Sequence, residues 1–168
     1  MIGLVTTTAA GRTAAARLAA ALPGTRAYDV RELAAAWREC AQLVCFLATG
    51  ATVRLLAPLL EDKATDPGVV VVDEGSRFAV ALLGGHGGGA NALAARVAGV
   101  LDATAVVTTA TDAVGLPGLD TLGWPVEGAV PAVSRALLDG TPVRLEADAT
   151  WPLPPLPVGE TGEYVLRV

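Results

Sequence analysis

Short apolar segments alternate along this chain with segments of helical periodicity, and this alternation limits the fold more than any other feature. Residues 43–48 are apolar throughout, which is typical of a central parallel strand covered on both faces. Residues 12–22 instead place apolar side chains such as Leu18 and Leu22 at helical spacing. Repeated units of this kind predict an α/β fold with a flavodoxin- or Rossmann-like, doubly wound, mostly parallel sheet.

The same patterns predict the remaining elements and two parts of the chain. The turn residues 74–76 separate two apolar segments, which can therefore pair as an antiparallel hairpin. We expect residues 1–125 to form one α/β domain, and residues 126–168 to form a helix–strand appendage with a proline-rich linker that starts a following domain. Strands are expected at 2–5, 25–28, 43–48, 69–72, 78–83, 105–107 and 142–145, and helices at 12–22, 31–39, 91–101 and 126–138, with a further one ending near 60.

Composition excludes several classes of function. No apolar run reaches the roughly 18 residues that a membrane span needs, and the start of the chain lacks the features of a signal peptide, so we expect a cytoplasmic protein. The net charge is −5 and the basic residues are scattered, which argues against nucleic acid as a partner. Cys40, Cys45 and one histidine do not make a convincing zinc site, so we expect no intrinsic metal, and we interpret Cys45 as a buried free thiol.

Polar residues follow several of the predicted strands. In doubly wound sheets, ligands bind at the carboxyl ends of the strands. Those ends carry residues 6–8, Thr49-Gly50, Asp73 and residues 108–112. We therefore expect a site along that edge, where the threonine-, glycine- and histidine-bearing loops converge.

A glycine-rich segment, residues 83–91, contains the only histidine, His86. Glycines let a backbone approach a ligand closely, amides at the start of the next helix can hold anionic groups, and histidine suits proton transfer near neutral pH. The alternative is a glycine-rich turn whose histidine merely caps the helix. The segment matches neither the dinucleotide-binding fingerprint nor a phosphate-binding P-loop.

Other candidate residues carry alternatives of the same kind. Thr49 and Gly50 can bind a carboxylate, with Arg54 one turn further on, or Thr49 can simply cap a helix. The charged loop around Lys63 is also compatible with a solvated connection. Residues 108–112 can line a pocket or form an ordinary Asx or Ser/Thr turn.

Taken in order and spacing, these segments resemble the cobalt-precorrin-5A hydrolase (CbiG) family, over its amino-terminal region and the start of its central region. In the glycine-rich segment the family pattern is Ser-Gly-His-Leu-Gly-Gly-Ala-Asn, whereas this chain has Gly84 and Gly87 in place of the serine and the leucine. The resemblance rests on residues 46–50, Arg54, 57–60, Asp62-Lys63, 65–67, 69–74, Gly85-His86, 88–91 and 108–112.

The resemblance implies a role in cobalamin biosynthesis: hydrolysis of the δ-lactone of cobalt-precorrin-5A, with release of acetaldehyde. It implies His86 as the proton-transfer group, oriented by Asp73. Cobalt belongs to the substrate, and no cofactor is expected. Substrate-binding roles are implied for Thr49, Gly50, Arg54, Lys63, Gly88, Gly89, Asn91, Thr108, Thr109 and Asp112.

The family resemblance also implies partners. Besides the corrinoid tetrapyrrole substrate, we expect a carboxy-terminal hydrolase domain or a fused or associated precorrin methyltransferase as partner. Association of two copies into a homodimer is a further alternative. The chain is then the amino-terminal portion of the enzyme. The main alternative is a noncatalytic domain that binds or docks a corrinoid for a partner, and a third is a flavodoxin-like domain kept for interaction alone.

Overall fold

The computed structural model describes residues 1–147 and 152–168, with residue 120 described by its backbone alone. The chain divides into two compact units, Met1–Val107 and Thr108–Val168. The first unit has two buried apolar clusters and the second has one, and each unit is described separately below.

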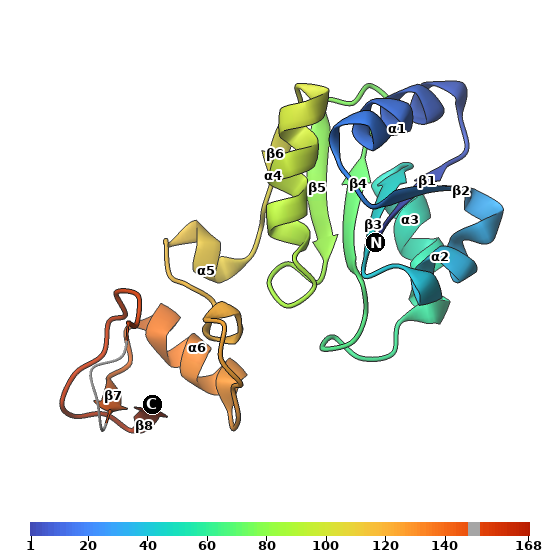
Figure 1. The fold of residues 1–168 in the computed structure, drawn as a ribbon. Coiled ribbons are helices and arrows are strands. Elements are labelled where there is room, and N and C mark those ends of the chain that lie inside the picture. Colours follow the sequence, from blue (N-terminus) through green and yellow to red (C-terminus); the bar gives the residue numbers. More distant parts are fainter. Residues whose placement is uncertain (148–151) are drawn as a thin grey trace. The chain divides into compact units, whose positions relative to one another are not determined.

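The first unit is built on a six-stranded sheet in the order β2-β1-β3-β4-β5-β6 (Figure 1). Strands β2, β1, β3 and β4 run parallel, β5 pairs with β4 in the antiparallel sense, and β6 runs parallel to β5. This confirms the predicted α/β class, the mostly parallel sheet and the hairpin. The strands are β1 (Ile2–Thr6), β2 (Thr25–Asp29), β3 (Gln42–Phe46), β4 (Gly68–Val72), β5 (Phe78–Leu83) and β6 (Thr104–Val106).

Helices cover both faces of this sheet, because its central strands are apolar on both. In β4, Val70 and Val72 pack in one buried cluster with α1 and α4, whereas Val69 and Val71 pack in the other with α2 and α3. This alternation has the two-residue period of a strand. Cys45 is a buried free thiol, as predicted. The helices are α1 (Ala9–Ala21), η1 (Val30–Glu32), α2 (Leu33–Glu39), α3 (Thr49–Leu56), η2 (Ala57–Leu59) and α4 (Ala90–Leu101), of which η1 and η2 are 3₁₀ helices.

The β4–β5 hairpin determines which loops can meet. Val72 pairs with Ala79 and Val69 with Leu83, so β5 returns the chain to the edge of the sheet where β4 begins. We call this the amino-terminal edge, because β1, β3 and β4 all start there. The opposite, carboxyl-terminal edge carries the residues that follow β1, β3 and β4.

The second unit packs two strands and short helices around Leu119, Ala136, Leu137 and Val143. Its strands β7 (Val143–Glu146) and β8 (Tyr164–Arg167) are parallel, and β8 was not predicted. Leu116 and Leu122 also pack against this cluster, so the unit begins earlier than the predicted division at residue 126. Its helices are α5 (Ala110–Ala113), the 3₁₀ helix η3 (Leu119–Thr121) and α6 (Val130–Asp139).

Two further predictions concern this part of the chain. The predicted proline-rich linker starts at Trp151, which lies outside the described residues, and residues 152–158 form no helix or strand. Among the described helices of the whole chain, none combines the length and apolar character needed to cross a membrane.

Candidate functional site

The glycine-rich loop between β5 and α4 lies against the start of β4, backbone to backbone. A Cβ atom added to Gly68 would stand 2.2 Å from the carbonyl oxygen of Gly88, and one added to Gly88 would stand 2.8 Å from Gly68 Cα. Gly84, at φ +62°, lies in the same contact. Because any side chain here would collide with main-chain atoms, glycine is required for the loop to pack in this way.

Hydrogen bonds within the loop occupy several amides at the start of α4. The amides of Ala90 and Asn91 donate to the carbonyls of Gly84 and Gly85, at 3.1 and 3.0 Å. The Gly89 amide donates to the carbonyl of His86 at 2.7 Å. The prediction that amides here are free for an anionic group is therefore wrong for these three, Gly89 included.

Gln42, the first residue of β3, connects the loop to the sheet. Its side-chain Nε2 donates to the carbonyl oxygens of Gly88 and Gly89, at 3.0 and 3.1 Å. Sequence reasoning missed Gln42 because a polar residue at the start of an apolar strand is ordinarily interpreted as the strand's solvated end. It also missed the role of Gly68, which reads as a turn residue before β4.

A cavity of about 760 Å³ opens at the amino-terminal edge, beside this loop. The loop contributes Gly87, Gly88 and Gly89, whereas Trp37 and Arg38 come from α2. The cavity thus brings together two segments that the sequence analysis singled out, the charged loop before β4 and the glycine-rich loop after β5. The other residues that line it are Cys40, Ala41, Gln42, Glu61, Ala64, Thr65, Asp66 and Pro67.

The acidic residues of the charged loop shape its backbone. The Asp66 carboxylate accepts from the amides of Glu61 and Asp62, at 3.2 to 3.4 Å. Asp62 in turn accepts from the amide of Ala64 at 2.8 Å. Lys63, the only lysine of the chain, lies exposed between them. The two carboxylates therefore hold a short turn in which Lys63 directly precedes Ala64, a residue of the cavity wall.

The opposite edge holds Thr49, Gly50, Arg54 and Asp73. Ala48 occupies the N-cap position of α3 and Thr49 is its first helical residue, so Thr49 is not the cap. Arg54 is exposed, and its guanidinium donates to the Gly50 carbonyl at 3.4 Å. These three residues are neighbours, as predicted, but they lie on the edge that does not carry His86.

Asp73 holds the β4–β5 turn. Its carboxylate accepts from the amides of Arg77 and Phe78, at 2.7 and 2.8 Å, and from the Arg77 side chain at 3.0 Å. Partial burial works against ionisation, but these hydrogen bonds outweigh it and hold the pKa of Asp73 below its usual value. Because β4 and β5 are antiparallel, Asp73 and His86 lie at opposite edges of the sheet. Asp73 therefore does not orient His86, and the loops that carry Thr49 and His86 do not converge at one edge. Both expectations from the sequence are wrong.

Other polar groups at the carboxyl-terminal edge serve local turns and caps. Thr8 caps α1 by accepting from the Gly11 amide, and its hydroxyl donates to Glu74 at 3.1 Å. A groove of about 380 Å³ beside α1 includes Arg12 and Asp29 in its wall.

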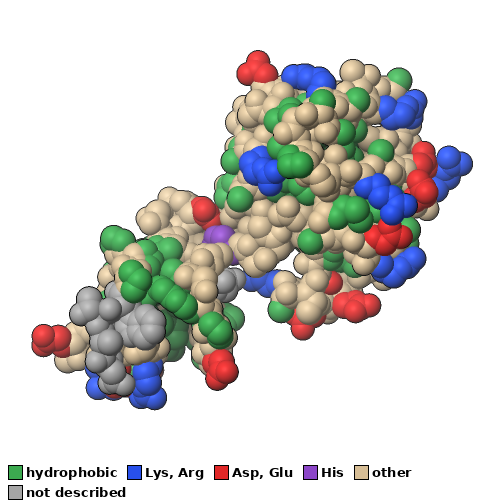
Figure 2. Space-filling view, viewed as in Figure 1, with side chains coloured by type: hydrophobic (Ala, Val, Ile, Leu, Met, Phe, Trp, Pro, Cys, Tyr) green, Lys and Arg blue, Asp and Glu red, His purple; other side chains and the backbone are tan. Residues whose placement is uncertain are grey.

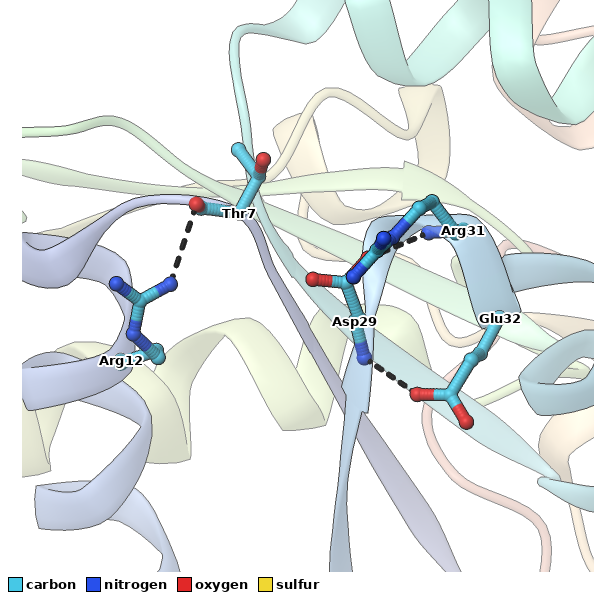
Figure 3. Close-up of polar contacts among 5 residues, drawn as sticks. All are labelled: Thr7, Arg12, Asp29, Arg31 and Glu32. Carbon is cyan, nitrogen blue, oxygen red and sulfur yellow. Dashed lines mark hydrogen bonds and ion pairs between the residues drawn. The ribbon is translucent and has the colours of Figure 1, made fainter.

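Figure 3 shows how these two residues are held: Arg12 donates to the Thr7 carbonyl, and Asp29 caps η1. Hydrogen bonds from the side chain and the amide of Arg31 lower the pKa of Asp29, and the charge of Arg12 adds to this. Charged side chains of both signs are interspersed over the visible face of the first unit (Figure 2).

Thr108, Thr109 and Asp112 belong to the second unit. The Thr109 hydroxyl donates to the Asp112 carboxylate across the first turn of α5. This bond joins two side chains, and the role of these residues in a substrate pocket stays a prediction.

The fold and the cavity define an α/β domain with a mixed sheet and a glycine-rich loop packed on its amino-terminal edge. Residues 31–112 match the family model described as cobalamin synthesis G N-terminal. Over these residues the chain matches the amino-terminal region of the CbiG family.

Named relatives agree with this match. The chain is 45% identical over 114 residues to the cobalt-precorrin-5A hydrolase of Salmonella typhimurium, covering 64% of this chain and 32% of that protein. It is 49% identical over 70 residues to the cobalt-precorrin-5A hydrolase of Priestia megaterium, covering 42% and 19%. The chain thus spans about a third or less of the length of these relatives.

A solved structure, that of a putative cobalamin biosynthesis protein G homolog from Sulfolobus solfataricus, shares the fold. The match has a TM-score of 0.58 at 18% identity and covers 99% of this chain and 54% of that one. At this identity the likeness concerns the fold alone.

Proposed function

We propose that this chain acts in cobalamin biosynthesis as the amino-terminal portion of a cobalt-precorrin-5A hydrolase, which opens the δ-lactone of its substrate and releases acetaldehyde. One observation carries the proposal. The charged loop at 61–67 and the glycine-rich loop at 84–89, both inside the family match, line a single cavity although the β4–β5 hairpin separates them in sequence.

In this proposal His86 moves the proton. Water adds to the lactone carbonyl and the acyl carbon–oxygen bond breaks, which gives a carboxylate and a hydroxyl group. In a second step the hydroxyl group loses its proton and its carbon becomes the aldehyde carbonyl, while the carbon–carbon bond to the macrocycle breaks. The macrocycle carbon keeps that electron pair and takes up a proton, so acetaldehyde leaves. A general base must take a proton from the attacking water, and imidazole suits that task near neutral pH. His86 directly precedes the three glycines that line the cavity, which supports its assignment to this step. Asp73, at the other edge, is left out of it.

The substrate brings its own cobalt and carries carboxylates that need partners. Arg38 lies in the cavity wall and can meet one of them, and the exposed Lys63, which directly precedes Ala64 of that wall, is a second candidate cation. Arg54 is at the opposite edge, so its part in the same site is not supported. We propose the carboxy-terminal region of a hydrolase, or a precorrin methyltransferase, as the partner.

A noncatalytic corrinoid-binding role is the second candidate. It is favoured by the fact that the chain spans 32% of the Salmonella typhimurium relative, since residues of the remainder can carry the chemistry. This function predicts that the chain binds a corrinoid and that turnover needs the rest of the enzyme.

One experiment tests both functions. Purified chain is mixed with cobalt-precorrin-5A, with and without the carboxy-terminal region of a relative, while acetaldehyde and the absorbance of the corrinoid are followed. We expect His86→Ala to abolish acetaldehyde release in whichever mixture is active, and Thr49→Ala, at the opposite edge, to leave it unchanged. Release at an unchanged rate from His86→Ala removes His86 from the mechanism, and absence of any change in absorbance on mixing refutes both functions.

A further inference from the structure

We infer that Gln42 is a positioning residue that fixes the conformation of the glycine-rich loop, and through it the place of His86 beside the cavity. The inference rests on the proposed function for its effect on catalysis. Its effect on the loop stands on the contacts of Gln42 alone.

Both hydrogens of the Gln42 side-chain amide are used by the loop. Nε2 donates to two consecutive carbonyls, those of Gly88 and Gly89. A carboxamide has two N–H donors on one nitrogen, so the pair of bonds fixes the direction of both carbonyls relative to β3. Removing the donors would leave two partly buried carbonyls without these partners, which is costly for the observed loop conformation.

Gln42 and Gly89 are also matched in shape. A Cβ added to Gly89 would stand 2.8 Å from Gln42 Nε2, and Gly89 has φ +70°, in the left-handed region that favours glycine. The loop can therefore bring its carbonyls to the amide only because Gly89 carries no side chain. Gln42 is half-buried at the start of β3, whose next four residues are buried, so the amide is attached to a rigid part of the sheet.

The link from Gln42 to His86 is short. The Gly89 amide, on the residue whose carbonyl Gln42 binds, donates to the His86 carbonyl at 2.7 Å. A change at Gln42 thus reaches the backbone of His86 through one residue. Since small displacements of catalytic groups reduce rates strongly, we expect Gln42→Leu to lower kcat about tenfold to a hundredfold, with a smaller change in KM.

Nuclear magnetic resonance can test this inference, because the two residues concerned each occur once in the chain. Gln42 is the only glutamine and His86 the only histidine of the chain, so the side-chain NH₂ signals of one and the ring signals of the other are identified in ¹⁵N-labelled full chain by substitution. We expect the Gln42 NH₂ protons to exchange with water more slowly than those of free glutamine. Exchange as fast as in free glutamine would overturn the inference.

The variants separate hydrogen bonding from packing. Gln42→Glu keeps the shape but presents a carboxylate to the two carbonyls at neutral pH, and Gln42→Leu keeps most of the volume without donors. We expect both to shift the His86 ring signals, and Glu at least as much as Leu. A merely space-filling role predicts that Glu leaves them in place, and that result would refute the inference. Thr65→Ala, which alters the same cavity wall, is the control and should leave the signals unchanged.

The two proposals fail separately. If the His86 signals shift in Gln42→Leu and Gln42→Glu but no mixture releases acetaldehyde, Gln42 positions the loop and the proposed function is wrong. If the enzyme is active and both variants keep the wild-type kcat and His86 signals, the function stands and the role of Gln42 is wrong. Circular dichroism confirms that each variant is folded.

Discussion

The carbonyl oxygen of Gly88 lies where a side chain on Gly68 would begin: a Cβ added to Gly68 would stand 2.2 Å from it. Gly68 starts β4 and Gly88 belongs to the loop after β5, so this contact joins the loop to the sheet. The loop conformation depends on it.

Gly68→Ala should therefore destabilise the first unit. We expect a loss of about 1–3 kcal/mol in the free energy of unfolding, as for other overpacked sites, because main-chain atoms cannot move aside as a flexible side chain can. Gly99→Ala is the matched control, since a Cβ there meets no described atom within 4 Å and lies inside α4. We expect this control to gain about 0.5–1 kcal/mol. Guanidinium unfolding followed by circular dichroism measures both, and equal stability of the two variants would contradict the close contact.

The two glycines that depart from the family pattern should differ in their tolerance of the family's residue. Gly87→Leu should change stability by less than about 0.5 kcal/mol, because a Cβ at this exposed position meets no described atom within 4 Å. Gly84→Ser should cost about 1–2 kcal/mol, because φ is +62° and its Cβ would stand 3.1 Å from Gly68 Cα. Thermal unfolding of the two variants distinguishes them, and the reverse order of stability would contradict the close contact between Gly84 and Gly68.

Asp73 should make stability depend on acid pH. Its pKa is lowered in the folded chain, so its contribution is present above the pKa of the unfolded state, about 3.9, and is lost as the pH falls through the lower folded value. We expect Asp73→Asn to cost about 1 kcal/mol at pH 7 and progressively less below pH 4. Asp139→Asn, which removes an exposed ion pair with Arg135, should cost about 0.5 kcal/mol or less. A cost for Asp73→Asn that does not change between pH 7 and pH 3 would argue against the lowered pKa.

Lys63 can be tested by chemistry as well as by substitution, since it is the only lysine. Acetylation removes its charge and reductive methylation keeps it. If Lys63 pairs with a substrate carboxylate, acetylation should raise the Kd for the corrinoid about two- to fivefold, as expected for an exposed ion pair, and methylation should leave it nearly unchanged. Lys63→Arg, in which only the amino terminus reacts, is the control. An equal effect of both reagents would assign no charge role to Lys63.

Much of the fold was predictable because strands that are buried on both faces consist almost entirely of apolar residues. After Gln42 and Gly68, the first residues of β3 and β4, both strands are apolar because helices cover both faces of the sheet. The turn after Asp73 correctly predicted the hairpin. Strand β8 was missed because Tyr164–Arg167 is short and half-exposed, so its pattern resembles a loop.

The site was harder to predict than the elements, for a geometric reason. Because β5 runs antiparallel to β4, the loop that follows β5 lies at the amino-terminal edge. His86 is therefore at the opposite edge from Thr49 and Asp73, although each of the three follows a correctly predicted strand. The contact between Gly68 and Gly88 and the bonds of Gln42 join residues far apart in the chain, and no local pattern of residue types indicates them.

The hairpin also makes strand length a determinant of the site. Because β5 leaves the turn at Ala79 opposite Val72 and reaches Leu83 opposite Val69, the distance travelled back along β4 decides where the glycines arrive. Two residues inserted into β5 alone would shift Gly88 past Gly68. The contact between these glycines would be lost, although no residue that lines the cavity would have changed. Insertions and deletions in this plain apolar strand should thus be far less tolerated than substitutions between aliphatic residues within it.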